Sequence, residues 1–255
     1  MFDIFPKNLA KGIVTEQGTG RVSTDENGLR LTVSPGGGYH NAQITDYRYG
    51  EYAFQWSPPI TLTVTASASN PELIGTAGFG FWNHPLSPDL RRLPRLPAAV
   101  WFFFGAPPHN LRLAYNSPGH GWKAQTIDAA HIRAAALAPV ALPLMLAMKL
   151  PALYRRLYPS IQKALKVSES ILPSTMLATD HTYQIMWRAD GCRFLVDGSP
   201  VLETPYSPGG KLGFIAWIDN QYMIATPQGH FRWGVTPLSG EQSLLIRSIS
   251  VEHHP

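Results

Sequence analysis

The stretch DHTYQIMWRADGCRFLVDG, residues 180–198, carries the clearest structural signal in the chain. From Tyr183 to Trp187, apolar or aromatic side chains alternate with Gln, Met and Arg, which is the period-two pattern of a half-buried strand. Asp190-Gly191 is a turn dipeptide, and the alternation resumes after it until a second turn at Asp197-Gly198. These residues therefore predict a β-hairpin.

The same alternation recurs along most of the chain and indicates a mostly β protein. The 22 glycines and 23 prolines suit many short strands joined by turns. With 255 residues, 44% of them hydrophobic and 15% charged, the chain can bury a large core, either as one sandwich or as two small domains. The further strands that we expect are 28–33, 42–56, 60–67, 75–82, 98–104, 110–115 and 122–127.

The strand pattern stops between residues 128 and 176, where Ala, Leu, Met, Lys and Pro replace the β-formers. We interpret 128–176 as a helical insertion, a lid or packing hairpin, in one sandwich domain built from 1–127 and 177–255. At about 100° per residue, the apolar side chains between Leu153 and Leu165 share one helix face, and basic side chains occupy the other. Pro159 is expected to kink or restart this helix.

The preceding stretch, 134–148, is uncharged, but a bilayer span needs about 20 apolar residues and this stretch is shorter and contains two prolines. Three interpretations of the insertion follow. It is a helical hairpin packed on the sandwich, a lid over a hydrophobic cleft, or an interfacial membrane anchor assisted by its basic face.

Charge and cysteine content limit the classes of partner and compartment. The net charge of +4 comes from scattered Lys and Arg without a nucleic-acid-binding motif, so no nucleic-acid partner is expected. Cys192 is the single cysteine and lies in an alternating strand, where we expect a buried structural thiol. The N-terminal residues lack the pattern of a secretory signal, which favours a cytoplasmic location, with membrane association as an alternative.

Several motifs together resemble glycoside hydrolase family 16, the laminarinases and β-glucanases. They are YHNAQITDYRYGEYAFQW at 39–56, AGFGFWNHP at 77–85, the hairpin at 183–198, and KLGFIAWIDN at 211–220. The resemblance covers most of the chain outside the insertion. It implies an all-β, concanavalin A-like jelly-roll sandwich of two antiparallel sheets with a concave ligand-binding cleft.

The catalytic motif of that family does not appear. Its strand carries Glu-x-Asp-x-Glu, and the corresponding stretch here is AAVWFFFG, 98–105. Anchored on Gly105, the three acidic positions fall on Ala98, Val100 and Phe102, and a slip of one residue gives Ala99, Trp101 and Phe103 instead. Residues 96–108 contain no Asp or Glu in any register. Hydrolysis of the family type, which needs two carboxyl groups, is therefore not expected.

An apolar cleft wall favours a hydrophobic or amphiphilic small molecule as the ligand. His84, Asn116 and His120 follow strands that should border the cleft, and the aromatic candidates can stack on a ligand. Histidine spacing suited to a metal is missing, as is a Gly-rich phosphate loop, so we expect neither a metal nor a cofactor. The predicted ligand-binding residues are Trp82, His84, Phe102, Asn116, His120, Trp217, Asp219, Tyr222 and Trp233.

Two alternatives remain open at this level. The first is a divergent enzyme that acts on a carbohydrate or a hydrophobic metabolite through residues such as His84, His120 or Asp219. The second is a membrane-surface or partner-binding module that uses the amphipathic segment 153–165 and its basic face.

Overall fold

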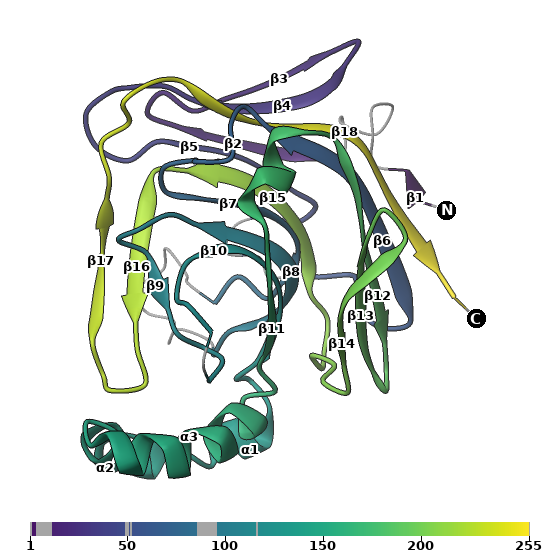
Figure 1. Cartoon of the computed structure of the whole chain (residues 1–255). Coiled ribbons are helices and arrows are strands. Elements are labelled where there is room, and N and C mark those ends of the chain that lie inside the picture. The colour runs from purple at the N-terminus through teal and green to yellow at the C-terminus, as the bar shows by residue number, and fades with distance from the viewer. Residues whose placement is uncertain are drawn as a thin grey trace.

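The computed structural model describes residues 2–3, 12–48, 51, 53–85, 96–115 and 117–254. In this part of the chain, strands form two large antiparallel sheets that pack face to face, and a small third sheet lies beside them (Figure 1). The predicted all-β jelly-roll sandwich with helices between its strands is confirmed.

The eight-stranded sheet contains the predicted hairpin near one edge. Its strands, in spatial order, are β14 (Ser199–Thr204), β13 (Gly191–Val196), β12 (His181–Arg188), β6 (Ile60–Ala68), β18 (Gln242–His253), β4 (Gly28–Val33) and β3 (Arg21–Asp25), with β1 (Phe2–Asp3) beside β18. Tyr183 pairs with Val196, and the turn between β13 and β14 places both Asp197 and Gly198 at positive φ, 50° and 77°. Positive φ at two successive residues is what a two-residue hairpin turn with the twist of its strands requires.

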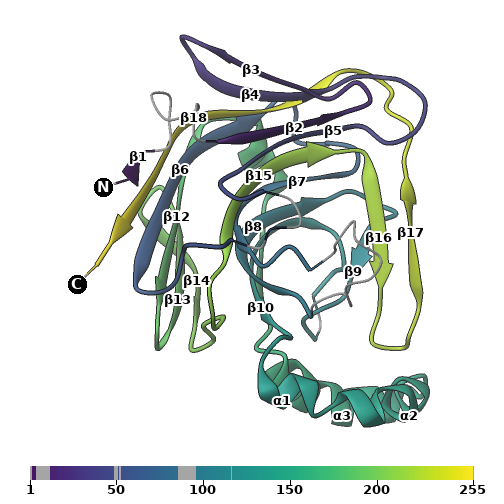
Figure 2. The same cartoon turned by 180° about the vertical axis from the view of Figure 1, so that it is seen from behind.

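The seven-stranded sheet has one face toward the core of the sandwich and an outer face turned away from it. Its order is β11 (Ser168–Leu172), β10 (Gly121–Asp128), β8 (Ala98–Gly105), β7 (Thr76–Trp82), β15 (Gly213–Asp219), β5 (Asn41–Thr45) and β2 (Ile13–Gln17). The third sheet, β17 (Phe231–Val235), β16 (Gln221–Ala225) and β9 (Asn110–Leu111), lies on the outer side, opposite the eight-stranded sheet (Figures 1 and 2).

Aromatic rings from both sheets fill the space between them. Phe102 of β8 contacts Tyr183 of β12 and Phe194 of β13 with ring centroids 5.0 and 5.4 Å apart, and Phe79 and Trp122 complete the group. All five side chains are almost fully buried. This packing is part of the apolar core that holds the two sheets together.

Two predicted strands are shorter than their sequence pattern suggested. The strand expected over 42–56 ends at Thr45, and the one expected over 110–115 contains two residues. After β5 the chain is held by the Asp46 carboxylate, which accepts hydrogen bonds from the Phe214 backbone N–H at 2.8 Å and from the Gln55 and Trp56 side chains. A side-chain acceptor therefore replaces the strand ladder there.

The predicted helical insertion is helical in its first two thirds. It contains α1 (Ile132–Ala135), a 3-10 turn (Ala138–Val140), α2 (Ala141–Ala147) and α3 (Pro151–Ala164), which lie at one end of the sandwich (Figure 2). The last part of 128–176 differs from the prediction, because β11 pairs with β10 and extends the seven-stranded sheet. Within the described residues, none of the helices has the length and apolar character needed to cross a membrane.

Helix α3 continues through Pro159, so the helix does not restart there. The carbonyl that loses its hydrogen bond belongs to Arg155 on the exposed face, where water can replace the missing donor. On the opposite face, the Tyr158 hydroxyl lies 2.6 Å from the Leu113 carbonyl, and Gln162 Oε1 accepts from the Tyr115 backbone N–H at 2.7 Å. The helix is therefore packed on the segment 112–115 that follows β9.

Candidate ligand-binding site

Strand β8 shows which residues face outward from the sandwich. Phe102 is fully buried in the core, as are Ala98 and Val100, so the three positions matched to the family's carboxylates point between the sheets. The prediction that Phe102 binds ligand is wrong for this reason. Anchored on Gly105, the motif falls on the core-facing side of β8, and a shift of one residue would place it on the other face.

The residues on the outer face of β8 are Ala99, Trp101 and Phe103. Trp101 has its ring centroid 5.7 Å from Trp82, 5.4 Å from Phe103 and 5.4 Å from Trp217. We call these four rings the aromatic floor: Trp82, Trp101, Phe103 and Trp217. They come from three adjacent strands, β7, β8 and β15, so the floor is built by the sheet itself.

Two glycines of β7 make room for the aromatic floor. A Cβ atom at Gly80 would lie 2.5 Å from Trp101 Cβ, and one at Gly78 would lie 2.9 Å from Trp217 Cη2. Both distances are shorter than van der Waals contact, so any side chain would displace the rings. The alternation of glycine and aromatic residues in AGFGFW is thus explained by two faces, with phenylalanine in the core and glycine under the tryptophans.

The three indole N–H groups of the floor all donate hydrogen bonds to other side chains of the protein. Trp101 Nε1 donates to Gln125 Oε1 at 2.6 Å, Trp217 Nε1 donates to Thr76 Oγ1 at 2.9 Å, and Trp82 Nε1 donates to the Tyr47 hydroxyl. Trp82 and Trp101 are half-buried, whereas Phe103 and Trp217 are buried. A ligand therefore meets mainly the ring faces and edges of Trp82 and Trp101.

His84 stands at one end of the floor, directly after β7. Its ring centroid is 4.6 Å from that of Trp82, and its Nδ1 lies 3.0 Å from the Tyr47 hydroxyl. Burial lowers the pKa of His84 to about 4, so the imidazole is neutral at pH 7. Its φ of 41° is uncommon for a residue other than glycine and turns the chain at this position.

His109 stands at the other end of the floor and was not predicted from the sequence. Its ring centroid is 5.1 Å from that of Phe103, and its Nδ1 accepts a hydrogen bond from the Met223 backbone N–H at 3.3 Å. Burial, followed by the nearby Lys123 and His120, lowers the pKa of His109 to about 4. The neutral ring therefore carries its proton on Nε2, which is buried and has no hydrogen-bond partner among the described residues.

Two carboxylates lie on the outer face of the seven-stranded sheet, far from each other. Glu169 of β11 pairs with Lys123 at 3.2 Å, and Asp219 of β15 accepts from the Thr76 hydroxyl at 2.8 Å and the Gln221 backbone N–H at 3.1 Å. Four strand-to-strand steps separate β11 from β15, or about 19 Å along the sheet. Glycoside hydrolysis uses carboxyl groups about 5–9.5 Å apart, so these two cannot act together.

Asp219 and His84 do not form an acid–base pair either. Asp219 pairs across the sheet with Thr76, at the start of β7, whereas His84 follows its end. The six residue-to-residue steps from Thr76 to Trp82 span about 20 Å of strand. Burial raises the pKa of Asp219 to about 7, and its hydrogen bonds join β15 to β7, which is a structural arrangement.

The remaining predicted residues are dispersed. His120 is exposed and lies near His109, whose pKa it influences. Tyr222 of β16 has the Arg232 guanidinium 5.9 Å from its ring centre, and Trp233 of β17 is 70% exposed. Asn116 lies outside the described residues. The structure thus brings Trp82, His84 and Trp217 into one site, with Asp219 further along β15.

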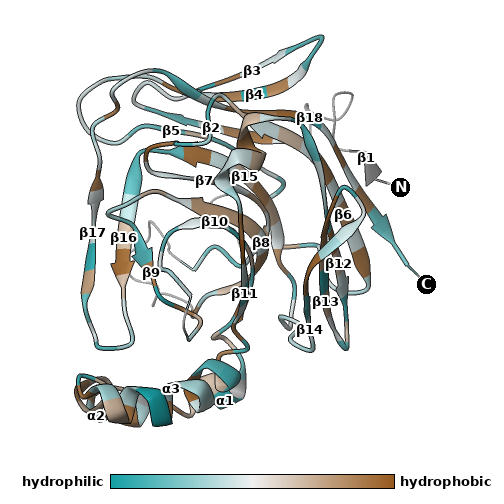
Figure 3. Cartoon of the chain, viewed as in Figure 1, coloured by the Kyte–Doolittle hydropathy of each residue, from teal (hydrophilic) through white to brown (hydrophobic). Residues whose placement is uncertain are grey.

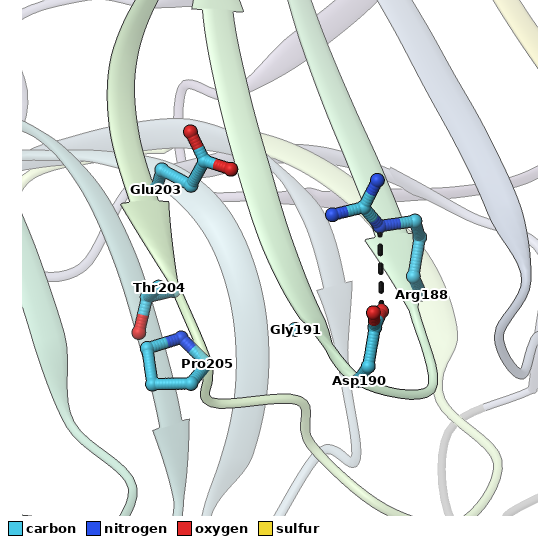
Figure 4. Close-up of a pocket in the computed structure, with 6 residues that line it drawn as sticks. All are labelled: Arg188, Asp190, Gly191, Glu203, Thr204 and Pro205. Carbon is cyan, nitrogen blue, oxygen red and sulfur yellow. Dashed lines mark ion pairs between the residues drawn. The ribbon is translucent and has the colours of Figure 1, made fainter.

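A separate hollow occurs at the ends of β12, β13 and β14, in the eight-stranded sheet (Figure 4). Arg188 and Asp190 form an exposed ion pair at 3.4 Å on one side of it. Its lining is completed by Gly191, Glu203, Thr204 and Pro205. Exposed pairs of this kind contribute little energy, and the hollow does not adjoin the aromatic floor.

Comparisons with known proteins show the fold. No family model matches the chain, and no curated protein matches it. One similar solved structure is a glycoside hydrolase family protein from Mycobacterium thermorestibile, with 13% identity, a TM-score of 0.51, and coverage of 98% of this chain and 96% of that one. The Crh5 transglycosylase in complex with NAG has 14% identity and a TM-score of 0.50, with coverage of 98% of this chain and 81% of that one. A legume lectin-like domain from Entamoeba histolytica has 10% identity and a TM-score of 0.50, with coverage of 98% of this chain and 93% of that one. The chain therefore has the concanavalin-like sandwich fold found in glycoside hydrolase-like and lectin-like proteins.

Proposed function

We propose that the outer face of the seven-stranded sheet binds a hydrophobic or amphiphilic small molecule without hydrolysing it. The observation that carries this proposal is the aromatic floor, whose three indole N–H groups are all bonded inside the protein. On the outer face β8 presents Ala99, Trp101 and Phe103, so this strand supplies no carboxylate there.

The polarity of the site favours a ligand with few hydroxyl groups. Gln125 lies beside Trp101, accepts a hydrogen bond from its indole N–H and donates one to Glu169. Glu169 also accepts a hydrogen bond from Lys123. A ligand hydroxyl that loses water here without gaining a hydrogen bond costs about 1–3 kcal/mol. Apolar surface laid on Trp82 and Trp101 contributes instead about 25 cal/mol per Å² of area removed from water.

His109 supplies one polar anchor. Its protonated Nε2 is a buried donor without a partner, next to Phe103. This N–H becomes reachable when the side chains that cover it shift, and a ligand whose apolar body covers the floor can then place a single acceptor oxygen, such as a carboxylate, carbonyl or hydroxyl, against it. This combination of an apolar body and one acceptor describes an amphiphile such as a fatty acid or an oxygenated terpenoid.

Carbohydrate binding is a second candidate. The apolar C–H face of a sugar ring stacks on tryptophan, and solved structures with this fold include a transglycosylase, a glycoside hydrolase family protein and a lectin-like domain. The two candidates differ in hydrogen bonding, because a sugar needs several partners at the floor.

Competition with a fluorescent dye distinguishes the two candidates. We expect fatty acids and terpenoids to displace protein-bound 1-anilinonaphthalene-8-sulfonate, whereas soluble β-glucan oligosaccharides do not. The Trp101→Ala variant should bind the displacing ligand at least about tenfold more weakly, because the floor loses its central ring. Trp101→Phe, which keeps an aromatic ring, should lose less, and Trp233→Ala is the matched control at an exposed tryptophan away from the floor rings.

Displacement by oligosaccharides alone would overturn the proposal in favour of carbohydrate binding. Release of reducing ends from laminarin, abolished in a Trp101→Ala variant, would overturn the non-hydrolytic part.

A further inference from the structure

Exposed apolar side chains gather on two neighbouring elements. Of the eleven large hydrophobic residues exposed in the described part of the chain, four lie between residues 140 and 150 of the insertion and three on β17, so the distribution is far from even. We call these seven the apolar surface: Val140, Leu142, Leu146, Leu150, Phe231, Trp233 and Val235. Figure 3 shows hydrophobic colour on α2 and on β17.

The β17 part of the surface is one face of an edge strand. Phe231, Trp233 and Val235 alternate along β17 and are 69%, 70% and 40% exposed. Residues two apart share a face of a strand, so the three side chains point the same way. Arg232, on the other face, lies over the Tyr222 ring. Aromatic residues this exposed have no packing role in the sandwich.

The helical part adjoins the hairpin that carries β17. A Cβ atom at Gly229, in the turn between β16 and β17, would lie 3.3 Å from Met145 Sδ of α2. In Figures 1 and 2 the end of this hairpin lies beside α2. Leu142 and Leu146 are four residues apart and share one face of α2, on which Leu142 is 64% exposed.

The two segments that carry the apolar surface contain basic side chains and no acidic ones. Residues 129–168 include six Lys or Arg and no Asp or Glu, and residues 221–235 include Arg232 and no Asp or Glu. Within the insertion, five of these basic side chains are exposed: Arg133, Lys149, Arg155, Arg156 and Lys163. Exposed apolar and basic side chains together, without acidic ones, complement a surface that is both apolar and negatively charged.

We propose that this surface docks on an anionic phospholipid membrane, with α2 and β17 entering the headgroup region. Leucine, phenylalanine and tryptophan are suited to the boundary between headgroups and acyl chains, and tryptophan is enriched there. Each nearby Lys or Arg adds electrostatic attraction to anionic lipid. Pairing with a second copy of the chain is disfavoured, because it would bring two basic surfaces together.

Vesicle flotation tests the proposal directly. The full chain should float with vesicles of phosphatidylcholine mixed with phosphatidylglycerol and should remain at the bottom of the gradient with phosphatidylcholine alone. Raising the salt concentration to about 1 M shortens the screening length to about 3 Å and should release the protein. On mixed vesicles the emission of Trp233 should shift to shorter wavelength, and Trp233→Phe should bind but lack this shift.

Variants separate the two components of the interaction. Phe231→Ser with Trp233→Ser, or Leu142→Ser with Leu146→Ser, should weaken vesicle binding at least about tenfold, because each pair removes two apolar anchors. Arg155→Gln with Arg156→Gln should reduce the preference for phosphatidylglycerol. Val14→Ser, which removes an exposed apolar side chain from β2, is the matched control and should bind like the unmodified chain.

Three results would overturn the proposal. They are equal flotation with both kinds of vesicle, the absence of flotation with mixed vesicles, and a concentration-dependent dimer that the Phe231→Ser, Trp233→Ser variant abolishes. Binding to a soluble acidic polypeptide but not to mixed vesicles would likewise assign the surface to a protein partner.

Discussion

Lys123 Nζ lies 3.2 Å from Glu169 Oε2, and both side chains are almost completely withdrawn from solvent. Gln125 donates to the other Glu169 oxygen and accepts from Trp101, so this buried pair connects to the centre of the aromatic floor. Burial lowers the pKa of Lys123, and the attraction of Glu169 opposes that shift. The pair therefore fixes the position of β11 against β10 and supports the ring of Trp101.

Replacing one partner of this ion pair should lower the free energy of unfolding more than replacing both partners by apolar side chains. We expect Glu169→Gln to lower the free energy of unfolding by about 3–5 kcal/mol, because it leaves the Lys123 charge buried without a counter-charge. The double variant Lys123→Met, Glu169→Leu should lose less than the sum of its single variants. Urea denaturation of the unmodified chain, Lys123→Met, Glu169→Leu and the double variant measures the coupling, and additive losses would contradict a buried pair.

Truncation of Phe102 should mainly lower stability, whereas truncation of the adjacent Trp101 should mainly lower ligand affinity. Phe102→Ala should lower the free energy of unfolding by about 3–5 kcal/mol, because it leaves a cavity in the sandwich core. Its ligand affinity, measured on the folded fraction, should change little. Trp101→Ala should affect affinity most, as argued above. If Phe102→Leu reduced affinity more than Trp101→Phe, the assignment of the two faces would be wrong.

His109 should make stability depend on pH. Its folded-state pKa of about 4 lies below its ordinary value of 6.5, so the unfolded chain takes up a proton first as the pH falls. The contribution of His109 is complete above pH 6.5 and is lost between pH 6.5 and about 4, to a total of about 3 kcal/mol. Asp219, whose pKa is raised to about 7, acts in the opposite direction and obscures this slope in the unmodified chain.

Comparison with His109→Gln isolates the effect. From pH 7 to pH 4 the unmodified chain should lose about 3 kcal/mol more of its unfolding free energy than this variant does. Urea denaturation at several pH values measures it. A difference that stays constant with pH would contradict a buried neutral imidazole.

Two glycines allow a test of backbone conformation alone. Neither Gly198 nor Gly37 has a neighbour within 4 Å of an added Cβ, but Gly198 has φ 77° and Gly37 is not at positive φ. Gly198→Ala should therefore lower the free energy of unfolding by about 1 kcal/mol, from the strain of the left-handed conformation. Gly37→Ala should be neutral or slightly stabilising. Equal effects in thermal denaturation would show that the turn does not require glycine.

The sequence alone predicted a mostly β protein, because alternating apolar residues and turn dipeptides are local signals, and its resemblance to glycoside hydrolase family 16 implied the sandwich. The hairpin from Tyr183 to Val196 and its second turn at Asp197-Gly198 follow directly from period-two alternation and from residues that accept positive φ. The absence of Asp and Glu from residues 96–108 is likewise evident from the sequence. The buried location of Cys192 followed from its place in the alternation, and burial raises the pKa of its thiol to about 12.

Tertiary structure alone decided which face of β8 carries the aromatic floor. AAVWFFFG is apolar in both registers, so its pattern cannot say whether Trp101 or Phe102 faces the core. Pairing with β7 settles it, because Gly78 and Gly80 leave room for large rings on one side, while Phe79 and Phe81 fill the core on the other. His109 and Glu169 are close to the floor only through long-range contacts with Phe103 and Gln125, and a single sequence gives no local signal for such contacts.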